Sequence, residues 1–91
     1  IGVSNFLQSH LEEILQVARI KPAVQQIEIH PLLPQRQMVE SCNRHEIQVE
    51  AYAPLGGGKL ITNPIVQKVA AEIGATPSQV LISFALQRNL V

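Results

Sequence analysis

Apolar and polar residues alternate along the chain with two different periods. Residues 1–4, 24–29 and 47–52 are either continuously apolar or change polarity at every second position, which predicts strands. Between and after them, apolar residues recur at three- and four-residue spacing, which predicts helices. The regular alternation of strand and helix indicates a parallel α/β fold without an internal linker. A further strand is expected to begin near Leu90.

Capping residues and prolines delimit the first two predicted helices. Ser9 is expected to cap the first, with Glu12 three residues later as its partner in a capping box, and Pro22 stops it. Pro34 is expected to open the second, which carries an apolar stripe including Cys42.

Two more helices are predicted after the third strand. Asn63 caps the first of them and Gly74 ends it, while Thr76 and Gln79 form a capping box for the second. The helix faces predicted to be buried against the sheet consist of Leu11, Ile14, Leu15, Val66, Val69, Val80, Leu81 and Phe84.

Polar side chains cluster where the predicted strands end. Ser4 and Asn5 follow the first strand, Gln26 lies on the polar face of the second, and Tyr52 ends the third beside a glycine-rich loop. Ligands of parallel α/β folds bind at this end of the strands. A hydroxyl, two amides and an aromatic ring suit a flat heterocycle bearing an amide better than they suit acid–base chemistry. The alternative is structural, with Ser4 and Asn5 in a turn and Tyr52 packed against its neighbours.

Other candidates favour structural interpretations. His30 is interpreted as a hydrogen-bonding residue at a strand end rather than a ligand, and Cys42 as a core thiol because no cationic neighbour activates it. His10 and His45 are expected on exposed helix surfaces. The stretch ending at Lys59 lacks the spacing of a phosphate-binding P-loop.

Charge and composition exclude several function classes. Seven basic residues balance seven acidic ones, so no electrostatic surface for nucleic acid or anionic membrane is expected. No apolar run approaches the roughly 18 residues of a membrane helix. The single cysteine cannot form an internal disulfide, which favours a reducing, cytoplasmic location. The chain begins without Met and inside a predicted strand, so both ends are expected to be truncated from a longer protein.

Four segments together resemble the aldo-keto reductases: residues 1–6, 26–31, 51–56, and 76–80 followed by 85–88. The resemblance covers the whole chain and implies one domain, residues 1–91, that forms part of a (β/α)₈ TIM barrel. It contains three parallel βα units and one extra helix, at about the fifth to seventh strands of that barrel. By the same resemblance, the intact protein uses NADPH, or NADH as the alternative, to reduce the carbonyl group of small aldehydes and ketones to an alcohol.

The resemblance also implies a role in cofactor binding for particular residues. Ser4, Asn5 and Gln26 match positions that hold the nicotinamide carboxamide, and Tyr52 matches the ring that stacks on the nicotinamide. The positions that match the loop near the cofactor pyrophosphate include Leu55 and Gly57. Gln25 stands where many members of the family have Asn, a difference expected to matter little.

The family's catalytic Asp, Tyr, Lys and His match no residue of this chain. The sequence contains no Asp, and its only tyrosine, Tyr52, matches the stacking position. The 91-residue chain alone is therefore expected to be an inactive segment of an oxidoreductase. Two alternatives are a partial-barrel module that associates with other copies through its open edges, and a non-catalytic nucleotide-binding relative.

Overall fold

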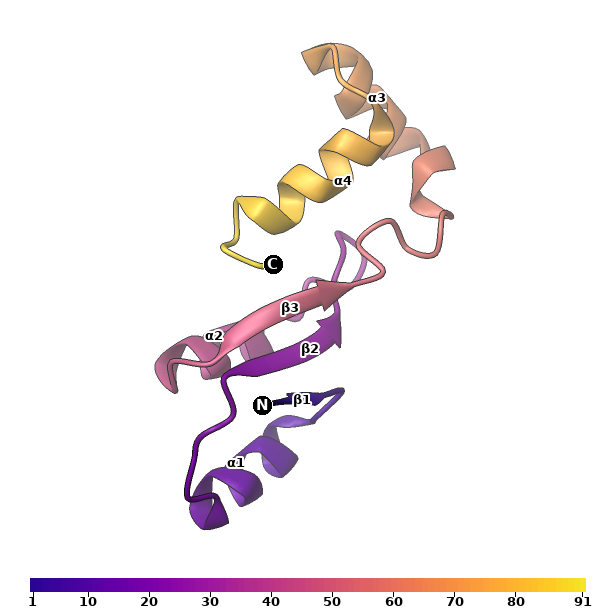
Figure 1. Ribbon diagram of the computed structural model, residues 1–91. Helices are drawn as coiled ribbons and strands as arrows, with labels where there is room; N and C mark the ends of the chain where they lie inside the picture. The colour runs from indigo at the N-terminus through magenta and orange to yellow at the C-terminus, as the bar shows by residue number, and fades with distance from the viewer.

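The three strand segments form one parallel sheet in the order β1-β2-β3 in the computed structural model, which describes residues 1–91 (Figure 1). The strands are β1 (Gly2–Ser4), β2 (Val24–Glu28) and β3 (Gln48–Tyr52). The sheet is continuous because Ser4 pairs in register with Gln26, and Gln26 with Glu50. The predicted parallel α/β architecture is confirmed.

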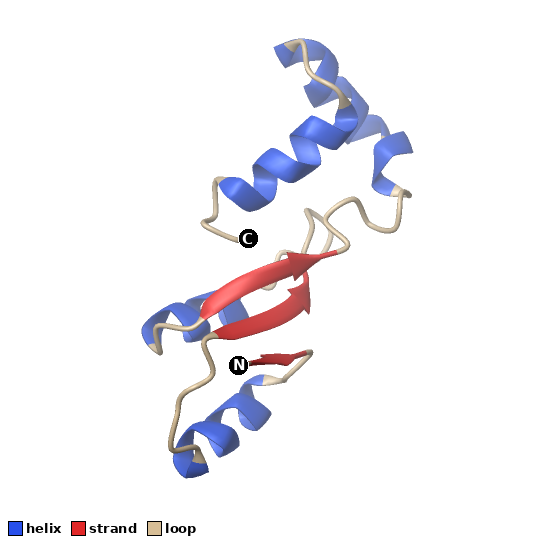
Figure 2. Ribbon diagram, in the orientation of Figure 1, coloured by secondary structure: helices blue, strands red, loops and turns tan.

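The helices flank this sheet, as the colouring in Figure 2 shows. In chain order they are α1 (Gln8–Val17), α2 (Arg36–Arg44), the 3₁₀ turn η1 (Leu60–Thr62), α3 (Pro64–Ile73) and α4 (Pro77–Leu86). α1 lies at one end of the molecule, and α3 and α4 lie at the other (Figure 1). The chain is accordingly elongated, with extents of 48 × 20 × 19 Å.

The two faces of the sheet differ in polarity because successive side chains of a strand point to opposite sides. On one face, Ile27, Ile29 and Val49 are buried beneath the helices. They belong to one apolar cluster that also receives side chains from α1, α2 and α4, including Leu11, Met38, Cys42 and Ala85. This is the hydrophobic core, and it fixes the strands relative to the helices.

The opposite face, here called the inner face, carries polar side chains that are half-buried or exposed. From the pairing register and the strand alternation, its polar members are Ser4, Gln26, Glu28, Gln48, Glu50 and Tyr52, and the apolar Val24 lies on the same face. Neither a lysine nor an arginine lies in these strands, so the inner face bears the negative charge of its two carboxylates.

One residue near the end of the chain, Val91, pairs with the free edge of β3. The Val91 N–H donates to the Val49 carbonyl at 3.2 Å, and the Ala51 N–H donates to the Val91 carbonyl at 2.8 Å. This is the pattern of parallel strand pairing. The strand expected near Leu90 is therefore represented by this single pairing.

The start of α1 differs from the prediction. The helix begins at Gln8 with Leu7 in the cap position, so Ser9 lies inside the helix and the prediction that it caps the helix is wrong. Instead, His10 reaches back, and its Nδ1 accepts a hydrogen bond from the Leu7 N–H at 3.2 Å. Pro34 also precedes α2 by two residues, because Gln35 adopts a left-handed conformation and the helix starts at Arg36.

The caps of α3 and α4 are confirmed. The Asn63 side chain accepts hydrogen bonds from Ile65 N–H at 2.9 Å and Val66 N–H at 3.3 Å. Gly74 ends α3 with a left-handed φ of 70°, and Thr76 and Gln79 form the reciprocal capping box.

We expect Asn63→Ala to destabilise the protein by about 1 kcal/mol, and Ser9→Ala to leave its stability nearly unchanged. Thermal melts of both variants test this, and equal losses would contradict the assigned helix starts.

Seven of the eight residues predicted to be buried against the sheet are buried or half-buried, but Val66, Val80 and Leu81 pack around Leu60 and not against the sheet, so that part of the prediction is wrong. Leu11, Val66 and Leu81 are buried, but Val69 is 38% exposed, so its predicted burial is wrong. α3 contacts α4 and η1 through Val66 and Ala70, which leaves the adjacent stripe of the helix in solvent.

No single helix is long and apolar enough to cross a membrane. Only α3 and α4 together reach that length and composition, and they are bent by 88°.

Candidate functional site

The β1–α1 connection is tied to the second strand at Gln26. The Asn5 N–H and the Ser4 hydroxyl both donate to the Gln26 carbonyl, at 2.9 and 3.1 Å. Asn5 has a left-handed φ of 58°, a conformation that asparagine tolerates better than most residues. The structure thus brings together the three polar residues that the sequence placed at the strand ends.

Gln25 secures the same connection from the core side. Its side chain is fully buried and its Nε2 donates to the Phe6 carbonyl at 3.0 Å. A long amide therefore anchors the loop that carries Ser4 and Asn5. Gln25 was not among the candidate site residues, although its alternation with Ile27 placed it on the core face.

The side chain of Gln26 is held from the third strand. Its Nε2 donates to Glu50 Oε1 at 2.8 Å, and the two residues pair in register. Glu50 was not among the candidates from the sequence. The period of the strand nevertheless placed it on the same face as Tyr52, which is the signal that could have found it.

Tyr52 lies half-buried at the carboxyl end of β3, opposite Glu28 in the neighbouring strand. Its carbonyl accepts a hydrogen bond from the Ile29 N–H at 3.3 Å. The next residue, Ala53, has a φ of 51°, which is unfavourable for a residue with a Cβ. Backbone strain of this kind concentrates at functional sites, so it supports this strand end as a candidate site.

The loop after β3 combines an apolar anchor with an open glycine segment. Leu55 packs against the cluster formed by Leu60, Val66 and Leu81. Gly57 has a φ of 67° and is exposed, with no heavy atom within 4 Å of the place where a Cβ would stand. A ligand can therefore approach the Gly57 backbone closely.

A hollow of about 440 Å³ lies beside this loop, between the ends of β2 and β3. The chemistry of its lining comes from Glu28, His30 and Lys59, together with the glycine backbone. His30 is buried, and its Nε2 lies 2.8 Å from Glu28 Oε2, while its Nδ1 has no partner. The interpretation of His30 as a strand-end hydrogen-bonding residue is confirmed.

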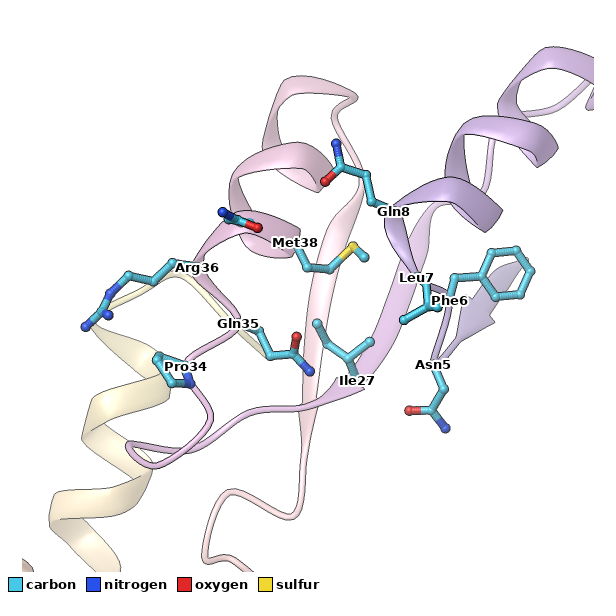
Figure 3. A pocket seen from close by; sticks show the side chains of 10 residues that line it. Asn5, Phe6, Leu7, Gln8, Ile27, Pro34, Gln35, Arg36 and Met38 are labelled. Atoms are coloured by element: carbon cyan, nitrogen blue, oxygen red, sulfur yellow. The ribbon is translucent and has the colours of Figure 1, made fainter.

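The largest hollow, about 590 Å³, lies elsewhere, between the first turns of α1 and α2 (Figure 3). Ile27 and Met38 line it between the two loops, and Asn5 is the only predicted site residue at its rim. The amide of Asn5 points away from Gln35 and Met38 in this view. This hollow therefore belongs to the helix layer and is distinct from the inner face that carries Gln26 and Tyr52.

The remaining reactive side chains do not form a second centre. Cys42 is fully buried, and this burial raises the pKa of its thiol, which confirms it as a core residue. No group of three or more His, Cys, Asp or Glu side chains is arranged to hold a metal ion. Around Ser4, Asn5, Gln26 and Tyr52 the strand ends offer hydrogen bonds and one ring face, which suits binding.

A parallel βα sheet with its polar residues at the carboxyl ends of the strands is the architecture of a barrel-type α/β enzyme. The sequence matches the Aldo/keto reductase family over residues 1–91, and the chain belongs to this family. An aldo/keto reductase of Synechocystis sp. is 43% identical, and the match covers 100% of this chain and 32% of the relative. The glyoxal reductase of Bacillus subtilis is 42% identical over 100% of this chain and 33% of its own length.

Solved structures give the same result for the fold. The aldose reductase of Schistosoma japonicum superposes with a TM-score of 0.92 at 45% identity, covering 100% of this chain and 30% of that one. A variant of Gox0644 in complex with NADPH superposes with a TM-score of 0.92 at 41% identity, covering 100% and 34%. The chain thus spans about a third of the length of the curated relatives and solved structures it matches. The predicted resemblance and the predicted partial-barrel fold are both confirmed.

Proposed function

We propose that this chain forms the nicotinamide-binding part of an NADPH-dependent reductase that converts small aldehydes or ketones to alcohols. The observation that carries the proposal is the cluster of Ser4, Asn5, Gln26 and Tyr52 at one end of the sheet, next to an open glycine loop. NADPH is proposed as the cofactor because the chain belongs to the aldo/keto reductase family and a Gox0644 variant binds NADPH. NADPH, when bound, provides the hydride for the carbonyl carbon.

The polar groups at the strand ends fit a carboxamide. This group carries two N–H donors and one carbonyl acceptor. At the strand ends, the side-chain amide of Asn5 makes no hydrogen bond within the chain, and Gln26 Oε1 accepts none. Ser4 donates to a carbonyl, so its hydroxyl oxygen can still accept. The Asn5 amide can therefore donate to the carboxamide oxygen, and Gln26 Oε1 and the Ser4 hydroxyl oxygen can accept from its N–H groups.

Tyr52 and the glycine loop suit the rest of the cofactor. The half-buried Tyr52 ring supplies an apolar surface for the nicotinamide ring, and a stacked ring is reached from its other face only. Further along the chain, Leu55 anchors the loop and Gly57 exposes its backbone near Lys59. We assign this segment to the cofactor phosphates, which the Lys59 cation and the Gly57 N–H, a donor without an acceptor in the chain, would attract.

We expect Tyr52→Ala, made in the whole protein, to weaken NADPH binding by up to about tenfold. Loss of an aromatic contact costs roughly 0.5–1.5 kcal/mol beyond the buried area. Cys42→Ala is the matched control, because this thiol is buried in the helix layer and its loss should lower stability without changing cofactor affinity. Titration by protein fluorescence quenching, with a thermal melt of each variant, measures both effects. Equal NADPH affinity in the unsubstituted protein and Tyr52→Ala would refute the stacking role.

A further inference from the structure

The amide of Gln26 is oriented by a carboxylate on the neighbouring strand. Gln26 Nε2 lies 2.8 Å from Glu50 Oε1, and both residues are half-buried on the inner face. The parallel register pairs the two positions directly, so the contact follows from the strand alignment.

This contact determines which end of the amide is available to a ligand. The two ends of a glutamine amide are similar in shape but opposite in hydrogen bonding, since the nitrogen donates and the oxygen accepts. An ionised carboxylate only accepts. Glu50 therefore holds the Gln26 nitrogen towards β3, and the Gln26 oxygen faces the other way as a free acceptor.

The backbone of Gln26 is fixed from the opposite side. Its carbonyl accepts hydrogen bonds from the Ser4 hydroxyl and the Asn5 N–H, both contributed by β1 and the loop after it. Both neighbouring strands therefore hold Gln26, one by its backbone and the other by its side chain. A side chain held in this way loses little further conformational freedom when it binds a ligand.

We propose that Glu50 is a positioning residue that makes Gln26 selective for the carboxamide of the nicotinamide. With its nitrogen held by Glu50, Gln26 presents its oxygen to a carboxamide N–H donor. This inference rests on the proposed function. It adds that the preference for an amide depends on a side chain that itself does not touch the cofactor.

The test compares NADP⁺ with its 3-acetylpyridine analogue, in which a methyl group replaces the carboxamide NH₂. The unsubstituted whole protein should bind NADP⁺ about two- to tenfold more tightly than the analogue, the range expected for one hydrogen bond. Glu50→Leu should weaken NADP⁺ binding by a similar factor and leave the affinity for the analogue unchanged within about twofold. Isothermal titration calorimetry measures all four affinities.

Two further variants control this experiment. Glu46→Leu removes a carboxylate that is 89% exposed at the amino end of β3, and it should preserve the preference for NADP⁺. If Glu50→Leu does not fold, Glu50→Gln replaces it. Its amide both donates and accepts, so it no longer imposes one orientation on Gln26, and the same narrowing of the preference is expected.

The outcomes separate this inference from the proposed function. Equal binding of NADP⁺ and the analogue by the unsubstituted protein would overturn the carboxamide assignment itself. A preference that persists in the Glu50 variants would overturn the role of Glu50 alone. An equal loss of affinity for both cofactors would also overturn it, because it would show that Glu50 acts only by supporting the sheet.

Discussion

A polypeptide consisting of residues 1–91 alone is expected to show no NADPH-dependent reduction of an aldehyde above the uncatalysed rate. Carbonyl reduction needs a proton donor at the carbonyl oxygen, and positioned acid catalysis is typically worth about 10²–10⁴-fold. The only tyrosine, Tyr52, lies opposite the carboxylate of Glu28, and the neighbouring strand contains no lysine. The sequence also contains no Asp.

The assay follows NADPH absorbance with a generic aldehyde, using polypeptide whose mass has been verified. The whole protein, assayed in parallel at the same concentration, is the positive control for substrate and conditions. Turnover by the verified 91-residue polypeptide would refute the prediction. It would also show that one of the residues to which we assign a binding or structural role can donate a proton to the substrate.

Local patterns were sufficient to predict most of the architecture. Strand periodicity placed β2 and β3 within a residue of their observed ends, and the caps at Asn63 and Thr76 depend on side chains that bond to the backbone within three residues. Signals of this kind act over a few residues, so they can be recognised without knowledge of the tertiary fold.

Predictions that required tertiary information were less successful. Ser9 is a residue type that often caps helices, but the helix begins at Gln8. The loop before it is held from the core, where Gln25 donates to the Phe6 carbonyl. Val69 shares an apolar stripe with Val66, yet only the latter faces α4 and η1. Helical spacing identifies an apolar face but does not state which part of it another element covers.

The proximity of the candidate residues was predictable, but the contacts between strands were not. Ser4, Asn5 and Gln26 lie together as expected, whereas the bond between Gln26 and Glu50, 24 residues apart, depends on the register of two strands. A single sequence shows which residues share a face of a strand, whereas it does not show which residue of the next strand lies beside them.

We expect Leu11→Ala to destabilise the whole protein by about 2–5 kcal/mol, the usual cost of removing a buried leucine side chain. Leu11 is fully buried and is the only buried residue of α1, so the packing of this helix on the sheet depends chiefly on it. Its cluster includes Ile27 and Ile29 of the second strand segment. Because α1 follows directly after Ser4 and Asn5, a loosened helix should also loosen the loop that holds the Gln26 carbonyl.

The measurement is a thermal melt with and without NADPH, since 1 kcal/mol shifts the melting temperature of a large domain by about 2–4 °C. Gln16→Ala, an exposed position of the same helix, is the matched control and should change stability by less than about 0.5 kcal/mol. The Leu11 variant should also lose part of its NADPH affinity, and added NADPH should recover part of its stability, because a ligand bound only by the folded state stabilises that state. A melting temperature of Leu11→Ala equal to that of Gln16→Ala would show that α1 contributes little to the core and that the loop is held by the strands alone.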